Sequence, residues 1–507
     1  MSISQQSLID KSQQLHQVVD QLVGIVADGV QHNTPIHEIE HKVFVRLLQA
    51  GRTTVQLLID CLGSGDCGEQ YETLDGEILK RSEHTKSRPY VSIFGPVHIE
   101  RYVYAPREGQ KVQFAEVDAR LALPEGKFSY LLQDWDQSFA MEQPFAQVGQ
   151  SLQKILGLEQ HVDSLERMNR DMAQTVDAYH VAQTLPPPHE EGEIFVQTAD
   201  GKGVPIRRPA DAPPIEDHQH KSGPKPDRKK MATVGAVYSV DRLVRTPEDV
   251  VQSLFRDPQE EDRPKQKRPR PRHKHMRALL NHTNAEGEEI HGAAAVFGWM
   301  ADEMSQRHAQ SGKPIINIMD GDEHLWEMRD VFQAEVEMVD VLDLLHVTPR
   351  LWKAASLFHA RGSREAKKFV RDRVERILQG QVDGVIRGLR RMSTTHPLCG
   401  ERQKELEKIC RYFENNRERM HYDEYLAAGY PIASGVIEGA CRHVVKDRLE
   451  RTGMSWVVEG AQAMLNLRCL YLTGEWELYV AYRVERETQR LYPYRDTLPS
   501  IHWSNAA

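Results

Sequence analysis

Three acidic residues lie where strands and a helix are expected, and carboxylates in such places suit chemistry on phosphate esters. Asp200 lies in "TADGKG", Asp320 lies in "IMDGD", and Glu438 lies early in the helical stretch "SGVIEGACRHVVKDRLERTGMSW". Carboxylate oxygens are the ligands that Mg²⁺ prefers. A pair of such ions clamps the attacking and leaving oxygens of a phosphodiester during in-line displacement. The three acids are therefore candidates for a metal-dependent site.

Each acid also has a plainer interpretation. An Asp-Gly pair marks a turn more often than a ligand, and Glu438 with Arg442 fits a helix N-terminal acid with its i,i+4 partner. The order of the acids on strand, strand and helix is more specific than any one of them. Asp322 competes for the second position, and Asp320 is preferred because it directly ends an apolar strand.

Helical spacing explains how Glu438 can reach such a site. An apolar stripe on its helix is expected to be buried, and Glu438 lies about 100° from that stripe, on the flank. From the flank, its carboxylate can face a cleft at the strand ends. The stripe consists of Ile437, Ala440, Cys441 and Val444.

Strands and helices that alternate must position these acids. The segments 193–206, 229–240, 313–320 and 335–347 predict four strands. The apolar part of the first is expected to end in Asp200, and Asp343 and His346 lie at the end of the fourth. Helices are expected at 293–310 and throughout 351–425. This alternation predicts an α/β domain, and the carboxyl edges of open α/β sheets are where sites are built.

A dense cationic segment, residues 256–280, lies between the second and third predicted strands. Its proline content works against regular structure, so a solvated basic loop is the plain interpretation. In a chain of net charge -9, such a concentration of positive charge favours contacts with phosphates that do not read bases. The candidate contacts are Lys265, Arg268, Arg270, Arg272 and Lys274.

The first third of the chain has other patterns. Residues 7–63 predict two amphipathic helices, and "YVSIFGPVHIERYVYAP" predicts a β-hairpin around Gly95 and Pro96. Residues 144–174 predict two short helices around a turn, which fits either a plain helical hairpin or a helix-turn-helix whose second helix enters the major groove. On that second helix, Ser164, Arg167, Asn169 and Arg170 are expected to point outward.

Length and composition limit the class of protein. A chain of 507 residues is expected to form two to four domains. No apolar run approaches the roughly 20 residues of a membrane span, and the first residues lack the apolar segment of a signal peptide. We therefore expect a cytoplasmic protein without a membrane partner, whose six cysteines are reduced thiols.

The segments "TADGKGVPIRR", "NIMDGDEHLW", "DLLHV" and "YPIASGVIEGACRHVVKDRLERTGMSWVVEGAQAMLNLR" resemble the ISKra-type DDE transposases of bacterial insertion sequences over roughly residues 93–472. The resemblance implies an RNase H-like catalytic domain whose triad is Asp200, Asp320 and Glu438. It also implies two Mg²⁺ ions, with Mn²⁺ as a substitute, held by the same three acids. "DLLH" resembles an Asp-x-x-His signature of Mutator-like transposases, which assigns supporting roles to Asp343 and His346.

The resemblance implies a function and partners as well. The protein would bind the terminal inverted repeats of its element and catalyse DNA cleavage and strand transfer, as a homodimer or higher oligomer on double-stranded DNA in a bacterial nucleoid. Arg442, Lys446 and Arg448 would hold the strand being cut. The alternatives are a DNA-binding regulator derived from a transposase and an RNase H-like structure-specific nuclease. One departure is "YAPREGQKVQF", which lacks the paired cysteines expected after the hairpin.

The expected domain organisation follows from these segments. Residues 1–88 form an N-terminal helical region, and residues 89–184 contain the β-hairpin and the helix-turn-helix. Residues 190–472 form the RNase H-like domain, with a basic loop at 256–277 and a helical insertion at about 348–425. Residues 473–507 form a C-terminal tail.

Overall fold

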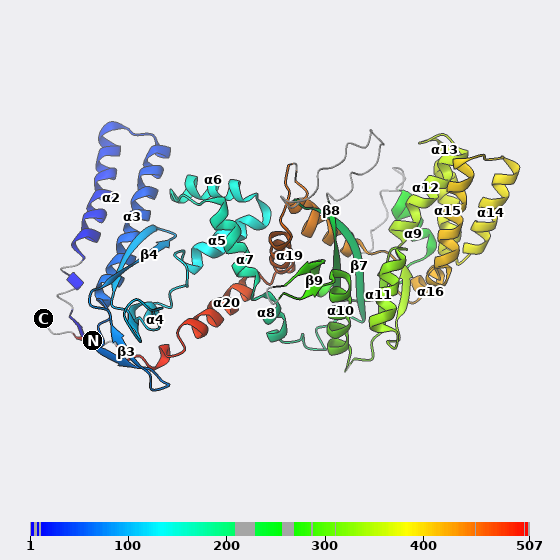
Figure 1. Cartoon of the computed structure of the whole chain (residues 1–507). Coiled ribbons are helices and arrows are strands. Elements are labelled where there is room, and N and C mark those ends of the chain that lie inside the picture. Colours follow the sequence, from blue (N-terminus) through cyan, green and yellow to red (C-terminus); the bar gives the residue numbers. More distant parts are fainter. Residues whose placement is uncertain are drawn as a thin grey trace, which may run out of the picture. The chain divides into compact units, whose positions relative to one another are not determined.

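The computed structural model of the chain describes residues 2–4, 8–9, 12–207, 229–255, 268–284, 287–309, 311–451, 453–500 and 502–504. The chain divides into two units, which are Met1–Thr175 with Glu477–Ala507, and Val176–Trp476. Figure 1 follows their elements along the sequence. Within the described ranges, no helix is both long enough and apolar enough to cross a lipid bilayer.

The first unit begins with two long helices, as the sequence predicted. Helices α2 (Gln13–His32) and α3 (Ile36–Leu62) lie side by side (Figure 1), and they approach closely at Gly29, where a Cβ would lie 2.8 Å from Ile39 Cδ1. The region up to residue 88 is not wholly helical. Strands β2 (Gln70–Glu72) and β3 (Ile78–Arg81) pair within it, and β3 also pairs with β6 (Tyr104–Ala105).

The predicted β-hairpin is confirmed. Strands β4 (Lys86–Ser92) and β5 (Gly95–Arg101) pair antiparallel, with Ser92 opposite Gly95. The turn therefore consists of residues 93–94 and precedes the Gly-Pro pair. The short helix α4 (Glu116–Arg120) follows the hairpin.

Three helices complete this part of the first unit. They are α5 (Tyr130–Glu142), α6 (Phe145–Leu156) and α7 (Val162–Ala173). Gly157, with φ of 69°, ends α6 in the left-handed conformation that glycine adopts most readily. The prediction that Asn169 points outward is wrong, because its amide is buried and donates to Gln137 Oε1 at 2.8 Å.

The expected C-terminal tail is largely helical and belongs to the first unit. Helix α20 (Trp476–Leu491) buries Tyr479, whose hydroxyl lies 2.9 Å from Thr175 Oγ1. The turn η4 (Arg495–Thr497) follows, and β14 (His502–Ser504) pairs in parallel with β1 (Ser2–Ser4).

The second unit contains a five-stranded mixed sheet of order β13-β12-β7-β8-β9. Strands β7, β8 and β9 pair antiparallel in succession, whereas β12 and β13 run parallel to β7. The unit is therefore α/β, as the alternation of strands and helices predicted. The strand bounds are β7 (Ile194–Pro205), β8 (Lys229–Val240), β9 (Arg272–Leu280), β12 (Ile315–Met319) and β13 (Val339–Leu342).

Three predicted strand details are wrong. The first strand continues past Asp200 to Pro205, because β8 offers antiparallel partners along that whole length. The predicted basic loop ends earlier than expected, because residues from Arg272 onward form strand β9, which pairs antiparallel with β8. The fourth strand ends at Leu342, so the next residues belong to helix α12.

Helices cover both faces of the sheet. One face packs on α10 (Gly292–His308) and α11 (Glu323–Gln333), through side chains that include Phe195, Met319 and Phe297. Ile194, Val196, Ile316 and Ile318 face the other way, into the larger core. The helices of that core are α9 (Pro247–Phe255), α12 (Leu344–Phe358), α13 (Arg364–Leu378), α14 (Val382–Thr395), α15 (Glu401–Asn416) and α16 (Tyr422–Ala427).

The helical region expected at about 348–425 corresponds to α12 through α16. The chain then returns to the sheet through α17 (Gly435–Ala440), the π-helical segment η3 (Cys441–Lys446), α18 (Asp447–Leu449) and α19 (Val458–Thr473). Helix α19 packs on β9, where Gln462 binds the backbone of Leu280 and Ala278. The smaller elements are α8 (Val176–Ala182), β10 (His282–Thr283), β11 (Glu289–Ile290) and η2 (Arg417–Arg419).

Candidate functional site

The register of three parallel strands places three aspartates in one row. Ala199 of β7 lies opposite Met319 of β12, and Met319 lies opposite Leu342 of β13. The residues that follow them, Asp200, Asp320 and Asp343, are therefore level. Neighbouring strands lie about 4.8 Å apart, so the row is compact. We call these three residues and Glu438 the acid edge.

Asp320 and Asp322 differ in their surroundings. Asp320 Oδ1 accepts the backbone N–H of Asp322 at 2.5 Å, and Asp320 Oδ2 lies 3.3 Å from His346 Nδ1. Asp322 is exposed, and its carboxylate caps helix α11 by accepting the N–H of His324 at 3.0 Å. Of these two aspartates, only Asp320 therefore belongs to the acid edge.

Gly321 separates these two aspartates for a steric reason. A Cβ at this position would lie 2.2 Å from Cε2 of Tyr412, so a side chain does not fit while the ring of Tyr412 packs there. The guanidinium of Arg350 stacks on that ring, 3.4 Å from its centroid, and donates to the carbonyl of His346 at 2.9 Å. Aromatic and cationic packing thus holds the segment that carries Asp320.

Asp343 is buried and joins two helices. Its Oδ1 accepts the N–H of Leu345 at 2.8 Å and caps α12, while its Oδ2 accepts the N–H of Ser434 at 3.1 Å, next to α17. Burial raises the pKa of the Asp343 carboxyl to about 6, although the two N–H groups and His346 lower it. The charge of Glu438 also raises this pKa, so the carboxylate of Glu438 interacts electrostatically with that of Asp343.

Glu438 projects from the first turn of α17, as the helical spacing predicted. Its side chain is exposed, whereas Ile437, Ala440, Cys441 and Val444 are buried. The helix changes to a π-helical segment at Cys441, and such segments occur frequently at functional sites. Glu438 therefore lies on the flank of a helix whose apolar side is anchored in the core.

Cys441 connects this helix to the first acid. Burial, the charge of Asp200 and a hydrogen bond to the Asp200 carboxylate raise the pKa of the Cys441 thiol. The thiol therefore stays protonated at neutral pH and donates to Asp200. The charge of Glu438 raises the same pKa, which places both acids in the surroundings of one thiol.

The strand register brings acids together that could bind a hard cation, but the carboxylates of Asp200 and Asp320 interact with groups of the protein itself. Within the described ranges, no three His, Cys, Asp or Glu side chains lie close enough together to hold a metal ion. Asp200 Oδ1 accepts the N–H of Gly201 at 2.7 Å, and both oxygens of Asp320 have partners. The donors are nevertheless carboxylates on adjacent strands, which is the set that Mg²⁺ prefers.

The three cations predicted beside Glu438 divide into two groups. Arg442 and Lys446 are exposed, and Arg442 lies 3.6 Å from Asp447. The prediction that Arg448 contacts DNA is contradicted, because its side chain is fully buried with its guanidinium 5.0 Å from the Trp456 ring. Position 448 continues the buried stripe through Val444, which explains its burial.

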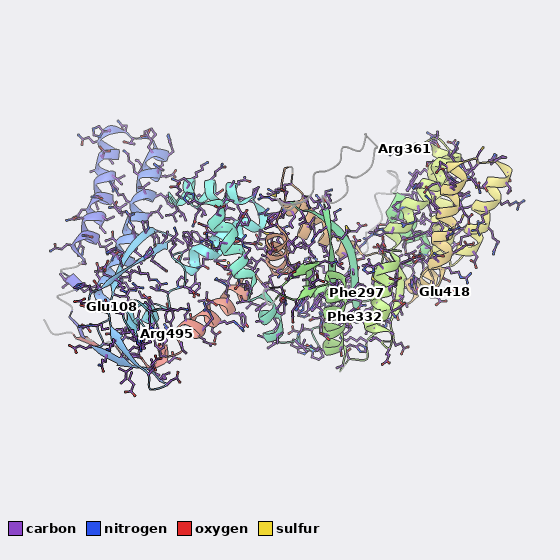
Figure 2. The ribbon with its side chains drawn as sticks, viewed as in Figure 1. Glu108, Phe297, Phe332, Arg361, Glu418 and Arg495 are labelled. Atoms are coloured by element: carbon purple, nitrogen blue, oxygen red, sulfur yellow. The ribbon has the colours of Figure 1, made fainter. Side chains whose placement is uncertain are left out.

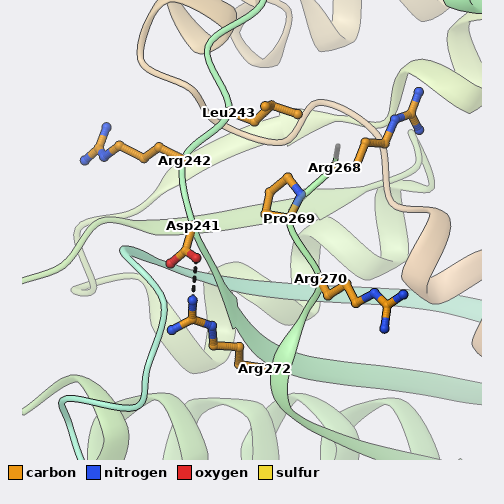
Figure 3. Close-up of a pocket in the computed structure, with 7 residues that line it drawn as sticks. All are labelled: Asp241, Arg242, Leu243, Arg268, Pro269, Arg270 and Arg272. Carbon is orange, nitrogen blue, oxygen red and sulfur yellow. Dashed lines mark hydrogen bonds and ion pairs between the residues drawn. The ribbon is translucent and has the colours of Figure 1, made fainter. Parts of the chain in front are cut away.

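A hollow lined by arginines lies at the opposite end of the sheet. Val240 of β8 pairs with Ile194, whereas Val234 pairs with Asp200, so the chain after β8 lies roughly 20 Å along the strand from the acid edge. The hollow has a volume of about 480 Å³. Figure 3 shows its lining, which consists of Asp241, Arg242, Leu243, Arg268, Pro269, Arg270 and Arg272 and which we call the arginine hollow.

The predicted basic residues have different surroundings there. Arg272 pairs with Asp241 at 2.5 Å, and Arg268 donates to Ser253 Oγ at 3.0 Å. Arg270 is exposed. Lys274 is half-buried in β9, which lowers its pKa, so it is a poorer phosphate contact than predicted. Lys265 lies outside the described residues.

The two candidate contacts of the predicted helix-turn-helix lie on α7. Arg167 is exposed and Arg170 is half-buried. The buried side of α7 is formed by Leu165, Met168, Asn169 and Met172, so Arg167 points away from it and Arg170 lies at its margin.

Sequence reasoning missed residues whose role depends on the fold. Ser434 and Thr198 bind each other through their hydroxyl groups, at 2.8 Å, between α17 and β7. Arg242 joins the arginine hollow from the end of β8. Neither pair of segments is adjacent in sequence, so no spacing could have indicated these contacts.

A search of the chain against protein-family models gives no match, and a search of curated protein sequences gives none either.

Proposed function

We propose that the chain is a metal-dependent DNA transposase of the DDE type with an RNase H-like catalytic domain. The observation that carries the proposal is the row of Asp200, Asp320 and Asp343 on three parallel strands, with Glu438 acting on the same site. The sheet order also supports the proposal. Strands β7, β8 and β9 pair antiparallel, and β12 and β13 extend the sheet parallel to β7. This order, with one acid on β7 and another directly after β12, suits an RNase H-like domain.

Asp200, Asp320 and Glu438 would hold two Mg²⁺ ions, which supply Lewis-acid stabilisation of the charge that develops on the phosphate oxygens. The remaining residues position these ligands. His346 orients Asp320 through its Nδ1, and Asp343 binds the start of α17, which carries Glu438. In cleavage, water attacks phosphorus and the P–O3′ bond breaks. In strand transfer, the released 3′-hydroxyl would attack a phosphorus atom of target DNA, so that a new P–O bond forms while the P–O3′ bond of the target strand breaks and its 3′-hydroxyl leaves.

The DNA-binding part of the proposal rests on exposed cations. Arg442 and Lys446 follow Glu438 and are available to the strand being cut. Helices α6 and α7, joined at Gly157, suit a helix-turn-helix in which Arg167 and Arg170 contact the element's ends. Assembly of two or more copies on DNA would bring two ends together.

The test is cleavage of labelled end fragments by the purified chain with Mg²⁺. Glu438→Gln retains the side-chain volume but removes the anionic oxygen, so cutting should fall by roughly three orders of magnitude or more while DNA binding is retained. The matched control is Glu459→Gln, which changes another exposed acid in the first turn of a helix, α19. Normal cutting by the Glu438→Gln protein would contradict the assignment.

A DNA-binding regulator is the second candidate. The observation that favours it is the separation of the acid side chains, since within the described residues no three of them can hold an ion as they stand. A regulator binds the end fragments without cutting them at any Mg²⁺ or Mn²⁺ concentration. A structure-specific nuclease instead cuts but does not join the end to target DNA, so the same assay separates all three functions.

A further inference from the structure

A pair of buried hydroxyl groups joins two of the segments that carry the acid edge. The hydroxyl of Ser434 lies 2.8 Å from that of Thr198, and both side chains are fully buried. Thr198 precedes Asp200 by two residues on the same strand, so both side chains point to the same face of the sheet. The hydroxyl pair therefore joins the strand of the first acid to the segment that precedes Glu438.

Ser434 also connects to the rest of the acid edge. Its backbone N–H donates to Asp343 Oδ2 at 3.1 Å, and its Oγ accepts the N–H of Ile437 at 3.3 Å, which caps α17. Glu438 lies four residues, or about one helical turn, further on. One residue thus contacts β7, the start of α12 and the start of α17, which are the elements that carry Asp200, Asp343 and Glu438.

We propose that Thr198 and Ser434 are positioning residues, whose hydroxyl pair sets the distance between Asp200 and Glu438 and thereby the affinity of the acid edge for a divalent cation. The inference rests on the proposed function, because it concerns the same acids. Groups that orient metal ligands without touching the metal commonly change metal affinity by about 10- to 100-fold when they are removed.

Thr198 gives the sharper variants, because its hydroxyl can be removed without changing its shape. Thr198→Val replaces the hydroxyl with a methyl group, whereas Thr198→Ser retains it. The readout is Mn²⁺ affinity of the full chain, measured by electron paramagnetic resonance without DNA. We expect Thr198→Val to weaken Mn²⁺ binding about 10-fold or more and Thr198→Ser to bind like the wild type. Ser434→Ala should match Thr198→Val, and the double variant should lose little more than either.

A matched control exists in the same sheet. Ser239 is fully buried in β8, and its hydroxyl binds Glu191 and the N–H of Gly192. Ser239 pairs with Phe195, five residues before Asp200, or roughly 16 Å along the strand. Ser239→Ala should lower the melting temperature as Ser434→Ala does but leave Mn²⁺ affinity unchanged.

The outcomes separate failure of this inference from failure of the proposed function. If Thr198→Val and Ser434→Ala bind Mn²⁺ like the wild type, the hydroxyl pair is only structural, and the proposed function stands. The inference is equally overturned if Thr198→Ser loses as much affinity as Thr198→Val. If the wild type binds Mn²⁺ no better than Asp200→Asn does, both the inference and the metal chemistry of the proposed function are wrong.

Discussion

The two ends of one sheet carry opposite charge. At the acid edge, Asp200 of β7 is level with Asp320 and Asp343, which directly follow β12 and β13, and the charge of Glu438 raises the pKa of Asp343. Roughly 20 Å away along β7, the arginine hollow collects four arginines around one aspartate. Clustered carboxylates need a cation to be stable, whereas clustered guanidinium groups attract phosphate. Opposite ends of the sheet thus suit different partners.

The two ends also differ in how they are built. Three of the four arginines in the arginine hollow are near neighbours in sequence, since Arg268, Arg270 and Arg272 alternate with proline, and Arg242 joins them from the end of β8. The acid edge uses residues from three distant segments, from Asp200 to Glu438, which are brought together by strand register and by the bonds of Asp343 to α12 and the start of α17. Local composition is therefore enough for a charged surface, whereas a site with defined distances requires the fold.

The largest expected effect separates Asp320 from Asp322 at the acid edge. Asp320→Asn removes a carboxylate of the row and should lower DNA cutting by several orders of magnitude. Asp322→Asn retains an acceptor for the N–H of His324, and Asn is as good a helix cap as Asp, so cutting should change less than about tenfold. Cleavage rates of both variants at saturating Mg²⁺ check this. The reverse ranking would move the second acid to Asp322.

A second effect concerns stability and tests the division of the cations beside Glu438. Arg448 is fully buried against Trp456, so Arg448→Ala should cost about 3 kcal/mol of unfolding free energy, as large truncations in cores do. Arg442→Ala, at an exposed position, should change stability by less than about 0.5 kcal/mol and instead weaken DNA binding. Urea unfolding and DNA titration of both variants measure this. If Arg448→Ala unfolds with the same free energy as Arg442→Ala, the division into a buried and an exposed group is wrong.

Much of the fold was predictable, because apolar periodicity depends on local sequence. The strand at 229–240 was predicted with its observed bounds, and Asp320 directly follows β12 as expected. Strand β9 was missed because its first residues are basic and follow a proline-rich segment, and because its pairing with β8 is not encoded locally. The end of β7 was misplaced for the same reason, since its last residues depend on a partner strand.

The acids of the candidate site were predictable by type, whereas their surroundings were not. Glu438 was expected on the flank of its helix, and it is exposed there. The buried state of Arg448 was missed because a charged residue in an apolar stripe is usually at the surface. The contact of Ser434 with Thr198 joins positions 236 residues apart, which no pattern within one helix or strand encodes.

The smallest expected effect concerns the arginine hollow, and it tests whether the two ends of the sheet act separately. Arg268 and Arg270 are exposed there, so the double change to alanine should weaken binding to all duplex DNA sequences about equally. A loss of roughly tenfold corresponds to about 1.4 kcal/mol. The slope of log affinity against log salt should also decrease by about 0.9 for each phosphate contact removed.

The matched control is Arg361→Ala, which removes an exposed arginine from the segment between α12 and α13, labelled in Figure 2. If it weakens binding as much as a single change in the arginine hollow, only net charge matters and the hollow is no site. Cutting at saturating DNA should be unchanged in the double variant, because the acid edge lies at the other end of β7. If the maximal rate of cutting falls while stability is retained, the two ends do not act separately, and the arginines act on the reacting strand itself.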